Sequence, residues 1–188
     1  MCISINGSEI VEVFQSEVAF TSATDKKPIV ATYGCDSCIA AGGYDPTHKI
    51  AFIAHFGSVD EIREGNVIFQ TIRKLTQEIF DNPIQLHLRG GVNGEPGSEE
   101  MIRELRAWTT HRDIPMNIVS ENLFNGTRLD RTSLSIDSRT GDTSTYSPLS
   151  NPHTRKRTAA DDLFAITRSI SPSIRLLYIP ASLHTCAK

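Results

Sequence analysis

The sequence predicts an α+β fold in which a largely antiparallel β-sheet or sandwich is covered by two main helices and followed by a C-terminal extension. Short segments rich in β-branched and aromatic residues recur up to about residue 146, in irregular order with two segments of helical apolar spacing. From Ser147 onward the chain becomes richer in proline, hydroxyl-bearing and basic residues. We therefore divide the 188 residues into a core of residues 1–146 and an extension of residues 147–188.

The first third of the chain is expected to form mainly strands. Its candidate segments are rich in β-branched, aromatic or small apolar side chains, and they are separated by loop compositions. Pro46 lies in a polar segment and presets a turn, which predicts a hairpin around it. The expected strands are residues 9–14, 28–32, 38–44 and 50–56.

Two helices are predicted after these strands. The longer one covers residues 58–80, because Ser58 followed by Glu61 is a capping box and an apolar stripe continues from it. The second helix is predicted to begin with Ser98 as its cap. The apolar stripe of the first helix consists of Ile68, Ile72, Leu75 and Ile79, and that of the second of Met101 or Ile102, Leu105 and Trp108.

The remaining elements are predicted from shorter patterns. Alternation over residues 84–89 predicts a half-buried strand with His87 on its solvent side, followed by a glycine-rich connecting loop at residues 90–97. Three further strands are expected at residues 114–119, 134–136 and 143–146. In the extension we expect an exposed linker over residues 147–158, a helix over 161–170 and a strand over 174–179.

Charge, hydropathy and cysteine content exclude several classes of protein. The formal net charge of −3 does not favour a nucleic-acid-binding surface. No apolar run approaches the roughly 18–20 residues that span a bilayer, so no membrane insertion is expected. The N-terminus lacks the pattern of a secretion signal, and four cysteines are too few for a disulfide scaffold. We expect a cytoplasmic protein with reduced thiols, with export as an effector without a classical signal peptide left open.

The segment around the predicted hairpin contains the candidate chemistry. If the turn centres between Pro46 and Thr47, and the strands pair without a bulge, Cys38 lies directly opposite His55. Facing residues of an antiparallel pair have Cβ atoms about 4.5–5.5 Å apart, within reach for an imidazole to activate a thiol. A buried and inert cysteine is the alternative interpretation.

Residues before Cys38 are predicted to complete the site. Thr32 ends the preceding strand, and its hydroxyl is placed to accept the second imidazole N–H of His55 and to fix the tautomer. The turn that contains Gly34, Asp36 and Ser37 has backbone amides suited to hold an oxyanion.

Cys35 and Cys38 also form a C-x-x-C sequence, which has two other uses. A redox dithiol requires a helix after the second cysteine, and a zinc site requires a second ligand pair; neither pattern follows here. We therefore expect no metal and no cofactor and interpret Cys35 as incidental, with a zinc or redox protein kept as a minor alternative.

The segment Thr32-Tyr33-Gly34-Cys35-Asp36-Ser37-Cys38, with Ala54-His55-Phe56 further on, resembles the CheD family of chemoreceptor glutamine deamidases. The resemblance covers roughly residues 10–146 and implies a catalytic triad of Cys38, His55 and Thr32. The Cys–His pair is also similar to that of bacterial deamidase toxins of the cytotoxic necrotizing factor type. Asp36 replaces a glycine of the family motif, and Gly57-Ser58-Val59 replaces its usual Met-Leu-Pro.

The resemblance implies a hydrolase that converts a glutamine side chain of a protein substrate, a chemoreceptor or another protein, to glutamate with release of ammonia. The thioester chemistry also fits a transglutaminase or a peptidase. A binding module without catalysis is the alternative from a different class.

Overall fold

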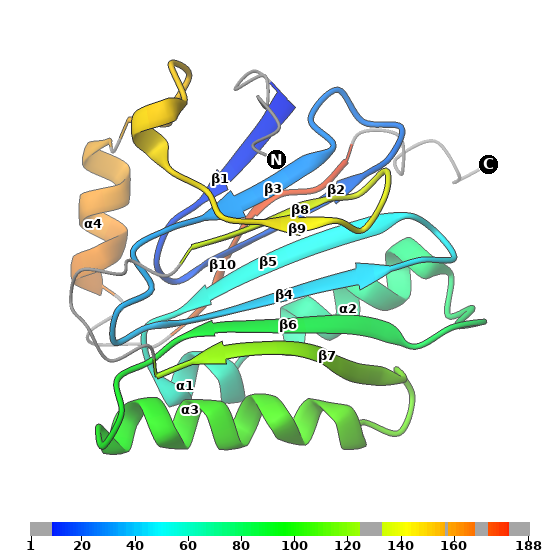
Figure 1. Cartoon of the computed structure of the whole chain (residues 1–188), viewed down its shortest axis with the longest axis horizontal. Helices are drawn as coiled ribbons and strands as arrows, with labels where there is room; N and C mark the ends of the chain where they lie inside the picture. Colours follow the sequence, from blue (N-terminus) through cyan, green and yellow to red (C-terminus); the bar gives the residue numbers. More distant parts are fainter. Residues whose placement is uncertain (1–8, 125–132, 157, 168–172, 181–188) are drawn as a thin grey trace.

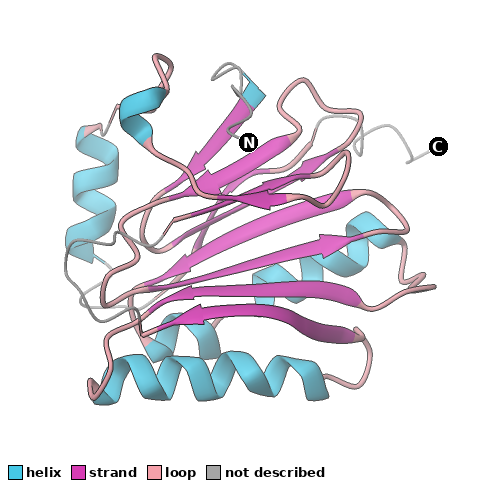
Figure 2. Ribbon diagram, viewed as in Figure 1, coloured by secondary structure: helices cyan, strands magenta, loops and turns pink. Residues whose placement is uncertain are grey.

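The computed structural model describes residues 9–124, 133–156, 158–167 and 173–180 and confirms the predicted α+β sandwich. In these residues, strands form two sheets (Figures 1 and 2). The smaller sheet has the order β1 (Ile10–Val13), β3 (Ile29–Thr32), β8 (Leu134–Asp137), β9 (Thr143–Ser144). The larger has the order β10 (Arg175–Tyr178), β2 (Glu17–Ser22), β5 (Ile50–Phe56), β4 (Ile39–Asp45), β6 (Ile84–Gly90), β7 (Met116–Leu123).

Pairing in both sheets is mostly antiparallel, as predicted, but three pairs are parallel. These pairs are β1 with β3, β2 with β10, and β6 with β7. The β6–β7 pair is joined through α3 (Pro96–Ala107), the kind of crossover that parallel strands require.

The larger sheet is the middle layer of the molecule. One face packs against α1 (Val59–Arg63), α2 (Asn66–Thr76) and α3, and the other face packs against the smaller sheet (Figure 1). The core on the helix side includes Phe20, Phe56, Ile68, Leu86 and Leu105, and the core between the sheets includes Val13, Val30, Ile53, Leu134 and Ile136. Because neighbours along a strand point to opposite faces, β5 supplies Phe52, Ala54 and Phe56 to the first core and Ile53 to the second. His55 therefore lies on the face that meets the smaller sheet.

The single helix predicted over residues 58–80 is wrong, because the chain forms two helices there. Ser58 does cap α1, accepting the Glu61 N–H at 3.4 Å. The break falls at Gly65, where an added Cβ would lie 2.8 Å from the Ile62 carbonyl oxygen. The second helix ends at Thr76 because Gln77 and Glu78 both have positive φ, and Ile79 is 52% exposed instead of completing the stripe.

The second predicted helix is present, but Ser98 is not its cap. Pro96 occupies the first turn of α3, where its fixed φ and missing N–H are tolerated, so the helix begins before Ser98. The predicted apolar face is confirmed, with Met101, Ile102, Leu105 and Trp108 all buried.

The C-terminal extension belongs to the larger sheet. The strand expected over residues 174–179 is confirmed as β10. The helix expected over 161–170 is present as α4 (Ala159–Thr167), and residues 168–170 of that prediction lie outside the described residues. Since β10 pairs with β2, the boundary predicted between residues 146 and 147 is not a boundary in the sheet. The exposed linker expected over 147–158 is also wrong in part, because Asn151 is buried and Arg155 forms ion pairs with Glu17 and Asp161.

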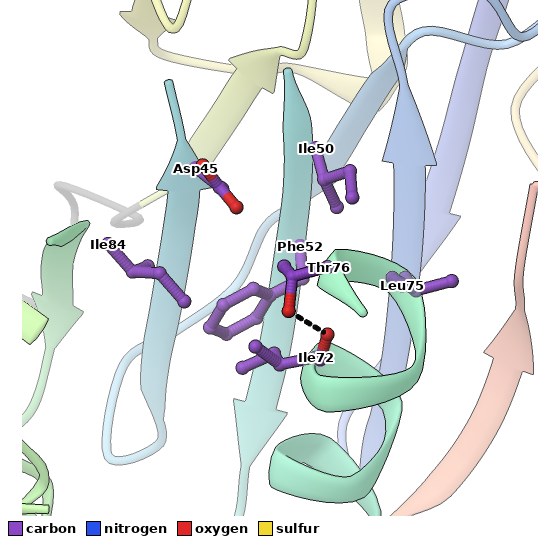
Figure 3. A pocket seen from close by; sticks show the side chains of 7 residues that line it. All are labelled: Asp45, Ile50, Phe52, Ile72, Leu75, Thr76 and Ile84. Carbon is purple, nitrogen blue, oxygen red and sulfur yellow. Dashed lines mark hydrogen bonds between the residues drawn. The ribbon is translucent and has the colours of Figure 1, made fainter. Parts of the chain in front are cut away.

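A small cavity lies between α2 and the strand ends beside the β4–β5 turn (Figure 3). Its volume is about 10 Å³, its lining includes Ile50, Phe52 and Ile72, and Thr76 Oγ1 beside it donates to the Ile72 carbonyl at 2.9 Å. This is at most room for one water, so the cavity is a packing defect and not a ligand site. Within the described residues, no helix has the length and apolar character needed to cross a bilayer.

Candidate active site

The β4–β5 hairpin sets the position of the predicted nucleophile, and its register differs from the prediction. Ala40, not Cys38, lies directly opposite His55. Cys38 immediately precedes β4 and is two residues from Ala40, which makes it a diagonal neighbour of His55. If the alternation of β4 is continued back by two residues from Ala40, the Cys38 side chain falls on the His55 face, so the difference in register does not by itself separate the two residues.

The turn chemistry explains this register. Asp45 Oδ1 accepts N–H groups of Thr47 at 2.8 Å and His48 at 3.2 Å, and Lys49 follows with a φ of 52°. These bonds make a loop of residues 46–49, with Asp45 paired to Ile50 across it. The centre of the turn therefore lies after Thr47 and not before it.

Thr32 and His55 form a hydrogen bond that joins the two sheets. Thr32 Oγ1 lies 2.8 Å from His55 Nδ1, and both residues are buried. The Thr32 hydroxyl donates its proton to the Val13 carbonyl at 2.7 Å, so the same oxygen can only accept from His55. His55 consequently carries its proton on Nδ1 and keeps its basic lone pair on Nε2. This hydrogen bond is compatible with the orienting role predicted for Thr32.

Cys35 lies closer to His55 than the sequence indicated. Its side chain is fully buried, with Sγ 3.9 Å from His55 Nδ1. Burial raises the pKa of the Cys35 thiol far above its usual range, and the neighbouring Cys38 contributes to the increase. Because the facing nitrogen is the protonated one, Cys35 has no base there. It packs against the imidazole, whereas Cys38 is partly exposed.

The loop before Cys38 is held through its carbonyl groups. Ser98 Oγ lies 3.1 Å from the Ser37 carbonyl, and the Gly91 N–H donates to the Cys38 carbonyl at 3.1 Å. In a trans peptide, the Ser37 carbonyl and the Cys38 N–H point in opposite directions. The Cys38 amide thus points away from Ser98, which is compatible with the predicted oxyanion-binding role.

Within this loop, Gly34 and Asp36 have different backbone requirements. Gly34 has a φ of 71°, in the left-handed region that favours glycine. Asp36 is exposed and is not among the residues of positive φ, so this turn does not require glycine at position 36. Ser37 is exposed beside it.

Gly90 and Gly91 brace the loop, a role that sequence reasoning missed when it treated residues 90–97 as a simple connection. A Cβ added to Gly90 would lie 2.3 Å from the Cys38 carbonyl oxygen and 2.7 Å from that of Cys35, and the φ of Gly90 is 105°. The available signal was the pair of adjacent glycines after a strand.

The end of β5 is fixed by a buried carboxylate. The Ser16 N–H donates to the His55 carbonyl at 2.6 Å, and Ser16 Oγ donates to Glu61 Oε1 at 2.5 Å. The Gly57 N–H donates to Glu61 Oε2 at 2.7 Å. These bonds restrain the backbone on both sides of Phe56, and therefore the position of His55.

The described part of the chain contains no group of three or more His, Cys, Asp or Glu side chains arranged to hold a metal ion. Comparison with protein-family models and with curated proteins finds no match to this chain.

Proposed function

We propose that this protein is a cysteine-dependent protein-glutamine deamidase, with Cys38 as nucleophile, His55 as acid and base, and Thr32 as orienting residue. The observation that carries the proposal is the hydrogen bond from His55 to Thr32, which leaves Nε2 as the base. Cys38 is partly exposed and lies two residues before Ala40, the residue that faces His55. The resemblance of the Thr32–Cys38 and Ala54–Phe56 motifs to the CheD family adds the reaction type.

The reaction needs only groups of this chain and water. The Cys38 thiol transfers its proton to His55, and the thiolate attacks the carboxamide carbon of the substrate glutamine. Backbone amides of the 34–38 loop stabilise the oxyanion. The nitrogen leaves as ammonia with the proton from His55, which then takes a proton from water as the water attacks the thioester. Glutamate and the Cys38 thiol are released.

The first test is the pH dependence of Cys38 alkylation, with Cys35→Ala in all variants so that one thiol of the loop is followed. We expect rapid labelling well below the unperturbed thiol pKa of about 8.5, and slow labelling after His55→Ala. Labelling that is slow and indifferent to His55 would contradict an activated pair and would favour a binding module.

Mass spectrometry of glutamine peptides then identifies the reaction. We expect conversion of glutamine to glutamate, abolished by Cys38→Ala and retained in Cys35→Ala. Incorporation of an added primary amine instead would indicate a transglutaminase, and cleavage of the backbone would indicate a peptidase.

A further inference from the structure

A row of side chains crosses the larger sheet from His55 towards its edge. Ala40 of β4 pairs with His55 on one side and with Arg89 of β6 on the other. Directly paired residues share a face of the sheet, so His55 and Arg89 lie on the same face with only a methyl group between them. At about 4.8 Å per strand, their Cα atoms are about 10 Å apart.

Arg89 carries a charge that no described carboxylate balances. It is half-buried, and its Nη1 donates to the Leu88 carbonyl at 2.9 Å and to Ser120 Oγ at 3.0 Å. Burial lowers the pKa of the guanidinium, with no acidic neighbour to offset it. In contrast, the half-buried Arg155 and Arg175 each pair with both Glu17 and Asp161.

His87 provides a second and independent observation beside Arg89. Contrary to the predicted solvent-facing position, it is only 7% exposed, and Nδ1 lies 2.8 Å from Ser120 Oγ. Its Nε2 is buried and has no hydrogen-bond partner among the described residues. Burial and the charge of Arg89 lower the pKa of His87 to about 4, so the imidazole is neutral at neutral pH.

The shared Ser120 hydroxyl indicates which ring nitrogen carries the proton. Ser120 accepts a hydrogen bond from Arg89, and its own proton is then available to His87 Nδ1. His87 in this arrangement keeps its proton on Nε2, a buried donor that lacks an acceptor. Among the described residues, His87 Nε2 thus presents a buried donor without an acceptor, and an unsatisfied buried polar group calls for an explanation.

We infer that Arg89, supported by His87 and Ser120, forms a subsite that binds a carboxylate of the substrate close to the reactive glutamine. Guanidinium and carboxylate pair strongly, and a carboxylate would supply both the counter-charge that Arg89 lacks and an acceptor for the donor of His87. The inference rests on the proposed function and refines it: the substrate is a protein segment in which an acidic residue accompanies the glutamine.

The experiment measures binding with catalysis removed. Cys38→Ala protein is titrated calorimetrically with acetylated, amidated peptides that contain one glutamine in an alanine and serine background. One glutamate is placed in turn at each of the three positions before and after the glutamine. We expect one glutamate position to tighten binding about tenfold or more over the peptide without glutamate.

The preference is expected to disappear with Arg89→Met and to survive the matched exposed substitution Arg103→Met. Arg89→Gln, which retains donors for Ser120, is expected to lose the preference too and guards against misfolding as the cause. The subsite is overturned if the Cys38→Ala protein binds no glutamate-containing peptide more tightly than the peptide without glutamate. It is also overturned if such a preference survives Arg89→Met. Because binding is measured without Cys38, the two results are independent: a failed alkylation test refutes the deamidase proposal, whereas a missing acidic preference refutes the carboxylate site at Arg89.

Discussion

At the scale of single residues, the proposed function of the candidate site depends on one hydroxyl. Thr32 reaches His55 from the smaller sheet, and its proton is committed to the Val13 carbonyl. This arrangement selects the imidazole tautomer without a buried charge. A neutral partner stabilises the imidazolium less than a carboxylate does, so its contribution to the rate is smaller.

We predict that Thr32→Val lowers kcat/KM for glutamine deamidation about tenfold to a hundredfold, below the roughly 10⁴-fold effect of disabling a charged orienting residue. The change also leaves the His55 N–H and the Val13 carbonyl without their partner, which costs about 1–3 kcal/mol in the free energy of unfolding. Kinetics and urea unfolding are measured together. Thr32→Ser, which keeps the hydroxyl, is expected to retain most activity.

If Thr32→Ser lowered kcat/KM as much as Thr32→Val, the methyl group of Thr32 and its packing would matter more than the hydrogen bond. If Thr32→Val were destabilised but fully active, the orienting role would be excluded.

At the scale of elements, the spacing of apolar residues predicted those features of strands and helices that depend on contacts between residues close in the sequence. The limits of β5 and the apolar face of α3 agree with the sequence, because alternation and helical spacing are properties of neighbouring residues. The register of β4 on β5 depends on the Asp45 carboxylate binding the Thr47 and His48 amides, and the strand pattern does not contain that information. The contact of Cys35 with His55 depends in turn on the loop path.

The C-terminal elements attach through a cluster of four charged side chains that sequence patterns did not predict. Arg155 and Arg175 each bind both Glu17 on β2 and Asp161 on α4. Hydrogen bonds from Arg175 and Thr158 lower the pKa of Asp161 well below its usual range. Burial would raise the pKa of Glu17, but hydrogen bonds from Arg155 and Arg175 more than offset it, and that pKa is lowered too.

Carboxylates with a lowered pKa stabilise the folded state above their unfolded pKa values, near 4 for these two groups, and lose that contribution as the pH falls. We therefore predict that Asp161→Asn destabilises the protein at pH 7, and that the difference from wild type narrows as the pH falls below about 4. Urea unfolding of both proteins between pH 7 and pH values below about 4 measures this difference in the free energy of unfolding. A difference that stays constant with pH would show that the charge of Asp161 is not what holds the extension.

At the scale of the whole molecule, the extension completes the sheet that carries His55. Glu17 pairs directly with His55 in the β2–β5 ladder, and its side chain is 2% exposed beneath Arg155 and Arg175. Phe14 lies under Arg155 in a cation–π contact and contacts Tyr33, which follows Thr32. Arg155, Arg175 and β10 thus cover the strand next to the candidate site.

We predict that a chain ending at residue 146 is less stable than the full chain, because it loses the pairing of β10 with β2 and both arginines that neutralise Glu17. Equilibrium urea unfolding compares the two chains. Glu17→Gln in the shortened chain is expected to recover part of the loss, since the amide carries no charge to be compensated, whereas the same substitution in the full chain is destabilising. If the shortened chain were as stable as the full chain, the extension would be an addition to a self-sufficient core. The sequence-based boundary at residue 146 would then describe the folding unit better than the sheet does.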